Sequence, residues 1–142
     1  NKLPQIVIPN SVKKINNSAF YSDSKLASVT FGSSVETIDS YAFGYCALTT
    51  LALPTSLRTI SSYAFTNNKL TDVVIPEGTT KVGYGAFNNN TSFVSITLPT
   101  TITNLENYIN RNYINENEPM TAYQAKFVAE GKPIYYAKYA LK

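Results

Sequence analysis

The side chains that could do chemistry in this 142-residue chain are few and of limited types. It has one Cys, no His and nine Asp and Glu residues. Without an imidazole, a Ser-His-Asp or Cys-His arrangement is unavailable, and so is a His-bearing zinc site. A single thiol forms neither an internal disulfide nor a thiolate metal cage. Carboxylates and amines are the tools that remain for acid–base chemistry.

The carboxylates do not have the arrangement that catalysis or metal binding requires. A glycosidase needs two positioned acids. The central acids instead occupy unrelated positions of the pattern described below: Glu36, Asp39, Asp72 and Glu77. The chain has no glycine-rich phosphate loop, no G-x-S-x-G motif and no acids at metal-ligand spacing. We therefore expect that it is not an enzyme and that it takes no cofactor and no metal.

Charge and hydropathy exclude two further classes of partner. The net charge is +3 with a pI near 8.9, and among the basic residues only Lys13 and Lys14 are adjacent. Without a dense basic patch, we expect no nucleic-acid binding. No apolar run approaches the roughly 20 residues that cross a bilayer, so we expect no membrane insertion by this segment.

The most informative feature is an internal repeat. Each unit opens on a large apolar residue: Leu3, Leu26, Leu48, Leu70 or Phe93. The dipeptide Ala-Phe recurs every 22 or 23 residues, at Ala19-Phe20, Ala42-Phe43, Ala64-Phe65 and Ala86-Phe87. Stacked, the units read L-x-x-[IVL]-x-[ILF]-P-x-x-[VLI]-x-x-[IVL]-x-x-x-A-F. Four full units and most of a fifth cover residues 3–105, and a fixed period of this length is the signature of a solenoid.

The columns of the repeat predict strands and a layered core. Apolar residues alternate with period two before each Pro, as in a half-buried strand. These pairs are Ile6/Ile8, Val29/Phe31, Leu51/Leu53, Val73/Ile75 and Ile96/Leu98. A unit this short cannot close its own core, so the units must stack with their strands in a parallel sheet. Apolar residues three and six positions after the Pro line the interior from a second side, and Ala-Phe lines it from a third.

This pattern resembles the BspA-type leucine-rich repeat, found mostly in surface and secreted proteins of bacteria and some protozoan parasites. The match is close over residues 26–70 and looser over 77–82, where Thr79 replaces an apolar residue. The family favours Gly after the second Ile; Gly83 keeps it, whereas Asn16, Asp39 and Ser61 replace it. The resemblance implies a leucine-rich repeat solenoid with a parallel sheet on one face. It also implies adhesion or protein binding, and an extracellular or cell-surface location as a piece of a larger bacterial protein.

Two columns of the predicted sheet point away from the core and form a candidate binding face, because solenoids bind partners on such extended faces. They consist of Gln5, Val7, Ser28, Thr30, Thr50, Ala52, Asp72, Val74, Ser95 and Thr97. These residues include no aromatic anchor and a single charge, so a solvated sheet made of good strand formers is the alternative. Any contact here should be broad and weakly specific.

Tyrosines form a second candidate surface at the edge of the solenoid. Tyr41 and Tyr63 share the column before Ala-Phe, with Tyr21, Tyr45 and Tyr84 nearby. Exposed Tyr gives a large contact area at low entropic cost, which suits protein and carbohydrate partners. The alternative is that these rings cover the edge and partly bury one another. We expect a protein partner, host or matrix proteins included; a glycan partner and a purely architectural spacer are the alternatives.

A polar column follows the Phe column. Three residues after each Phe lies Asp23, Cys46, Asn68 or Asn90, and such side chains hydrogen-bond buried main-chain groups at turns. We therefore predict a structural role for Cys46, because no His or adjacent cation is present to lower its pKa. Asn67-Asn68 and the Asn run at 88–90 predict tight turns that tolerate positive φ.

The repeat stops after Leu105, and we predict that residues 106–142 cap the C-terminal end of the solenoid. Thr103-x-x-Glu106 is typical of a capping box and predicts a helix near 104–114. Thr121-x-x-Gln124 predicts a second helix from 122 to about 130, and residues 134–141 alternate as a strand does. The chain is thus divided into repeats (1–105) and a C-terminal α/β cap (106–142). The alternative for the tail is a partner-docking or interdomain segment.

Overall fold

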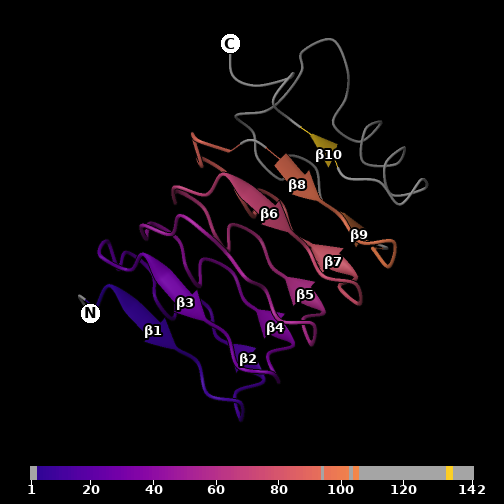
Figure 1. The fold of residues 1–142 in the computed structure, drawn as a ribbon, viewed down its shortest axis with the longest axis horizontal. Coiled ribbons are helices and arrows are strands. Elements are labelled where there is room, and N and C mark those ends of the chain that lie inside the picture. Colours follow the sequence, from indigo (N-terminus) through magenta and orange to yellow (C-terminus); the bar gives the residue numbers. More distant parts are fainter. Residues whose placement is uncertain (1–2, 94, 103, 106–133, 136–142) are drawn as a thin grey trace.

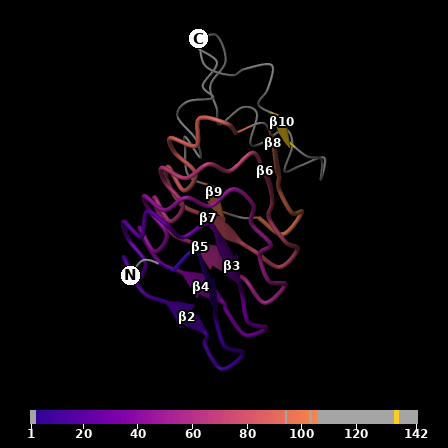
Figure 2. The same ribbon diagram turned by 60° about the vertical axis from the view of Figure 1, so that its left-hand side comes forward.

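The computed structural model describes residues 3–93, 95–102, 104–105 and 134–135. Short strands form two staircases along the chain (Figure 1), and the staircases keep their order when the molecule is turned (Figure 2). One contains β1 (Gln5–Val7), β3 (Ser28–Thr30), β6 (Asp72–Val74) and β8 (Ser95–Thr97). The other contains β2 (Lys14–Ile15), β4 (Thr37–Ile38), β5 (Thr59–Ile60), β7 (Lys81–Val82) and β9 (Asn104–Leu105). Equivalent strands of successive units pair in parallel, which confirms the predicted repeat solenoid.

The first staircase is interrupted at the third unit. β1 pairs with β3, and β6 with β8, but residues 49–53 form no strand. Within the described chain these five residues also lack main-chain hydrogen bonds, and Leu51 and Leu53 are only half-buried. The strand predicted at Leu51–Leu53 is therefore wrong. The other units place β-branched Val or Ile in this segment, whereas the third unit has Leu-Ala-Leu, whose strand propensity is weaker.

The second staircase is a continuous five-stranded sheet in the order β2-β4-β5-β7-β9. Its apolar column, which includes Ile15, Ile38 and Ile60, faces the core as predicted, although strands were not predicted here. β9 pairs with β7 through Val82↔Leu105, so the start predicted for the helix near 104–114 is wrong, because residues 104 and 105 form a strand; residues 106–114 lie outside the described residues. Leu105 continues a column of the repeat, and its pairing with the preceding unit outweighs the local capping signal.

The turn that contains Ala-Phe forms a third side. Alternate amides donate to the next unit: Phe20 N to Ala42 O, Phe43 N to Ala64 O and Phe65 N to Ala86 O, each at 2.8 Å. The turn is the same whether its first residue is Asn16, Asp39, Ser61 or Gly83, because each of these carbonyls accepts from the Ala three residues later. The first three units therefore form this turn without the family's Gly, whereas at Gly83 an added Cβ would lie 2.5 Å from Ser62 N.

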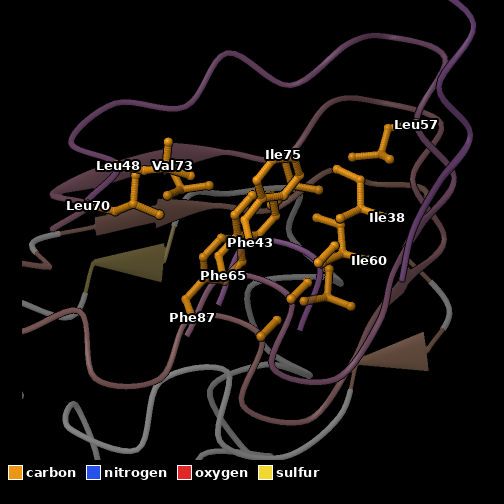
Figure 3. Close-up of a cluster of buried hydrophobic side chains, with 14 of the residues drawn as sticks. Ile38, Phe43, Leu48, Leu57, Ile60, Phe65, Leu70, Val73, Ile75 and Phe87 are labelled. Atoms are coloured by element: carbon orange, nitrogen blue, oxygen red, sulfur yellow. The ribbon is translucent and has the colours of Figure 1, made fainter. Parts of the chain in front are cut away.

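Between the three sides lies a ladder of stacked Phe rings. Phe65 stacks on Phe43 and on Phe87, with ring centroids 5.5 Å apart and planes 3° apart in both pairs. All three rings are fully buried. Figure 3 shows them between one group that includes Leu48, Leu70 and Val73 and another that includes Ile38, Leu57 and Ile60. The predicted core columns are confirmed for most members, with exceptions that include the exposed Leu3 and Ala19 of the first unit and the half-buried Phe31, Leu51 and Leu53.

The polar column after Phe is confirmed as a hydrogen-bonding ladder for the two Asn residues. Asn68 Nδ2 donates to Phe43 O at 2.8 Å and Phe65 O at 3.0 Å, and its Oδ1 accepts from Leu48 N. Asn90 repeats this arrangement one unit later. Asp23 does not, because both of its buried carboxylate oxygens lack a hydrogen-bond partner in the described chain. A carboxylate has no proton to donate to the carbonyls that the Asn amides bind.

Of the predicted tail, the structure describes one short strand, β10 (Ile134–Tyr135), which pairs antiparallel with β8. This confirms the first two residues of the strand predicted at 134–141. The helices predicted beyond residue 105 and the rest of the predicted cap lie outside the described residues. The described part shows a repeat solenoid, and the α/β cap stays a prediction.

Replacing Phe65 with Ala removes the middle ring of the ladder, and we expect the free energy of unfolding to fall by about 3–5 kcal/mol. Urea denaturation followed by circular dichroism measures this change. Phe20 offers a matched control, since it is half-buried and stacks at the end of the ladder on Phe43. The Phe20→Ala loss should be smaller, and equal losses at the two sites would contradict the ladder as the source of stability.

Replacing Asn68 with Asp should destabilise the chain by about 3 kcal/mol or more, because a buried charge would face two carbonyl oxygens. The control is Asn68→Cys. Cys46 shows that a thiol in this column donates to the carbonyl of the Phe in the preceding unit, Phe20. We expect that variant to lose only about 1–2 kcal/mol, from the unpaired Leu48 amide. The same urea titration compares the two, and an Asp variant as stable as the Cys variant would be the contrary result.

Candidate interaction surfaces

The strand face points outward as the alternation predicts. Gln5, Thr30 and Asp72 are exposed, and Val7 and Val74 are 73% and 62% exposed although they are apolar. The register places the two columns side by side within each half of the sheet. These side chains offer hydroxyl, amide and small apolar groups with a single carboxylate, as expected of a broad contact surface.

The structure does not bring all ten predicted residues into one continuous face. Thr50 and Ala52 are exposed but belong to the segment 49–53, which forms no strand. The face therefore consists of two halves, and Val7 and Val74 lie in different halves. The segment between the halves contains the half-buried Leu51 and Leu53.

The predicted tyrosines do form one cluster, which we call the tyrosine cluster: Tyr21, Tyr41, Tyr45, Tyr63 and Tyr84. Tyr41 stacks on Tyr63, with centroids 5.1 Å apart and planes 13° apart. Tyr21 contacts Tyr41 at 5.8 Å and Tyr45 at 5.4 Å, in both cases edge to face. Tyr63 contacts Tyr84 in the same manner at 5.6 Å. Tyr21 and Tyr45 are still 46% and 44% exposed, so the rings bury one another only in part.

Three of these tyrosines have a backbone conformation that their side chains disfavour. The φ angles of Tyr41, Tyr45 and Tyr63 are 57°, 58° and 58°. In other units the same columns hold Ser18, Ser22, Gly85, Asn67 and Asn89, also with positive φ, so the turn itself requires the left-handed region. For an L-residue other than Gly or Asn this conformation costs about 1–2 kcal/mol. The sequence indicated it only at the Asn turns.

Cys46 is a structural member of the polar column, as predicted. It is 8% exposed, and its thiol donates to Phe20 O at 3.2 Å. Burial raises the pKa of the Cys46 thiol to about 11; a hydrogen bond from the Asp23 main chain opposes the rise, and the charge of Asp23 adds to it. The thiol is therefore neutral at physiological pH and is not activated as a nucleophile.

The charged side chains form no centre for chemistry in the part of the chain that the structure describes. No three His, Cys, Asp or Glu residues are grouped there as metal ligands. Lys14 and Asp39 form an ion pair at 3.4 Å on the surface, with 55% and 28% of their side chains exposed. The same residues include no helix with the length and apolar character needed to cross a membrane.

The repeat geometry agrees with a known family. Residues 1–116 match the model of the BspA type leucine rich repeat region in six copies. The chain belongs to the BspA-type leucine-rich repeat family. Membership indicates a protein-interaction module, in a family that is generally non-catalytic.

Solved structures support the fold. A leucine-rich repeat protein from Bacteroides ovatus is 33% identical over 75% of this chain, with a TM-score of 0.70. The T. pallidum leucine-rich repeat protein is 27% identical over 72% of this chain, with a TM-score of 0.66. This chain spans 28% and 55% of the lengths of these two proteins. No curated protein is significantly similar to it.

The state of Cys46 can be checked by alkylation with iodoacetamide at pH 8. Because the pKa rises from 9.0 to about 11 in the folded chain, the thiolate fraction at pH 8 falls roughly 100-fold, and the native reaction should be slower by that factor than in urea. Glutathione under the same conditions controls for the reagent. Equal rates in native and urea-unfolded chains would contradict the buried, neutral thiol.

Proposed function

We propose that this chain is a protein-binding module of a bacterial surface or secreted protein and that it mediates adhesion. Membership of the BspA-type family supports both the surface location and the role. The Bacteroides ovatus and T. pallidum relatives are leucine-rich repeat proteins of bacteria. The module recognises its partner by shape, hydrogen bonds and apolar contact, without a chemical step.

The in-register parallel stack is the observation that carries this proposal. Pairing such as Thr37↔Thr59 and Thr59↔Lys81 places equivalent residues of successive units one strand spacing apart. The buried Phe and Asn ladders hold the units together. Side chains on the outside are therefore presented in rows on a firm support, and little conformational entropy is lost when a partner binds across several units.

The experiment measures binding of the immobilised full chain to purified fibronectin, laminin, fibrinogen and collagen by biolayer interferometry. We expect at least one of them to bind with a Kd of about 10 μM or tighter, corresponding to about 7 kcal/mol. Serum albumin and the urea-unfolded chain are the controls.

Binding that survives unfolding of the chain would show a non-specific contact and contradict the proposal. Absence of binding to every protein of the panel would favour the architectural spacer. Binding confined to neutral oligosaccharides would instead assign the module to glycans.

A further inference from the structure

The tyrosine cluster is not part of the core. The core cluster of the described residues consists of aliphatic side chains, Phe, Ala and Cys46, without a tyrosine. Tyr21 and Tyr41 lie over the turn at Gly44, where an added Cβ would be 3.3–3.4 Å from both rings. In the described chain the hydroxyls of Tyr21, Tyr41 and Tyr45 form no hydrogen bond with protein. Tyr21 and Tyr41 thus cover this turn, and the hydroxyls of all three tyrosines have no hydrogen-bond partner in the described chain.

The local backbone gives no reason for tyrosine at two of these positions. Tyr41 and Tyr45 occupy left-handed columns in which other units have Gly85 and Asn67, residues that adopt this conformation readily, as well as Ser18, Ser22 and Tyr63, which do not. Side chains that contradict the local backbone preference concentrate at functional sites. Tyr21 at the end of the first unit and Tyr41 and Tyr45 in the second therefore combine partial exposure with hydroxyls that form no hydrogen bond in the described chain, and Tyr41 and Tyr45 add backbone strain.

The chemistry of the cluster indicates a partner surface without charged side chains. The four turns at residues 16–23, 39–46, 61–68 and 83–90 contain no Lys or Arg, and their acids are only Asp23, which is buried, and Asp39, which pairs with Lys14. What they expose is mainly Tyr, Ser and Asn, the composition of antibody paratopes. Electrostatic attraction by this surface is therefore weak, and apolar contact with hydrogen bonding to hydroxyls must supply the affinity.

The ring geometry favours a protein over a sugar. Sugars stack on flat, open aromatic faces, but one face of Tyr41 is covered by Tyr63. Tyr21 lies at 77° to Tyr41 and at 64° to Tyr45. The result is a stepped surface of ring edges and hydroxyls, into which the side chains and carbonyls of a protein can fit.

We propose that Tyr21, Tyr41 and Tyr45 form the principal docking surface of this module, for an uncharged patch of apolar side chains and main-chain carbonyls on a protein partner. The inference rests on the protein-binding function proposed above and assigns it to the turn side of the solenoid. The strand face is divided at residues 49–53 and has no aromatic residue in its columns. Aromatic anchors dominate the binding energy of protein interfaces.

The test uses replacements that the solenoid itself contains in the same columns. The docking variant combines Tyr21→Thr, Tyr41→Ser and Tyr45→Asn, the residues present at Thr66, Ser18 and Asn67. The control variant combines Asp72→Ser and Val74→Thr on the strand face, following the column partners Ser95 and Thr97. Because each replacement occurs in the same column of another unit, both variants should fold, which circular dichroism and urea unfolding verify.

Binding of both variants is measured against the matrix proteins that bind the wild-type chain. We expect the docking variant to bind at least about 30-fold more weakly and the control variant to stay within about threefold of wild type, as anchors and rim residues do. Raising the salt to about 0.5 M NaCl should change the wild-type Kd by less than about threefold, because no charge pair carries the contact.

The outcomes separate the two proposals. If the wild type binds and the docking variant binds equally well, the tyrosine assignment is wrong while the protein-binding function stands. A loss in the control variant alone would move the docking surface to the strand face. If the wild type binds no protein of the panel, the function fails and the assignment fails with it.

Two further outcomes test the chemistry of the contact. A triple Tyr→Phe variant that binds as wild type would overturn the role of the hydroxyls. Strong weakening of binding by salt would overturn an uncharged contact.

Discussion

Main-chain hydrogen bonding from one unit to the next sets the spacing on which the rest of this structure depends. It occurs on all three sides, for example from Ile8 N to Thr30 O, from Asp39 N to Ile15 O and from Phe43 N to Ala64 O. These bonds hold equivalent residues about one strand spacing apart. The Phe rings therefore stack at 5.5 Å, and the Asn side chains bridge neighbouring units. Surface residues inherit the same spacing, which makes rows of them available to a partner.

The core could be predicted from the sequence because apolar columns report burial directly. Every described member of the Leu, strand and Ala-Phe columns in the fourth unit is buried, from Leu70 to Phe87. Main-chain geometry is less accessible to this reasoning. Positive φ at Tyr41 and Tyr45 belongs to the turn that every unit repeats, and side-chain polarity carries no information about it. The unpaired carboxylate of Asp23 was equally hidden, because the column tolerates Cys as well as Asn.

The strand wrongly predicted at 51–53 and the helix start wrongly predicted at 104–105 have a common physical origin in the balance between local and inter-unit interactions. Leu51 and Leu53 have the strand period but not the β-branched residues that favour the pleat, and here the inter-unit pairing is lost. Asn104 and Leu105 follow a helix-capping signal, yet they pair with β7 because Leu105 continues an apolar column. The repeat period alone therefore predicts which side of the solenoid a residue lies on. Its strand propensity and its pairing with the adjacent unit decide whether it joins a sheet.

The same balance distinguishes the two candidate surfaces. Thr30 and Val74 on the strand face are residues that a strand favours for its own stability, so their presence needs no partner to explain it. Tyr41 and Tyr45 are disfavoured by the conformation that the turn imposes on them. Stacking against Tyr63 and contact with Tyr21 offset part of this cost, yet Asn or Gly would avoid it altogether. Selection for folding alone gives no reason for this choice, whereas selection for contact area at the turn does.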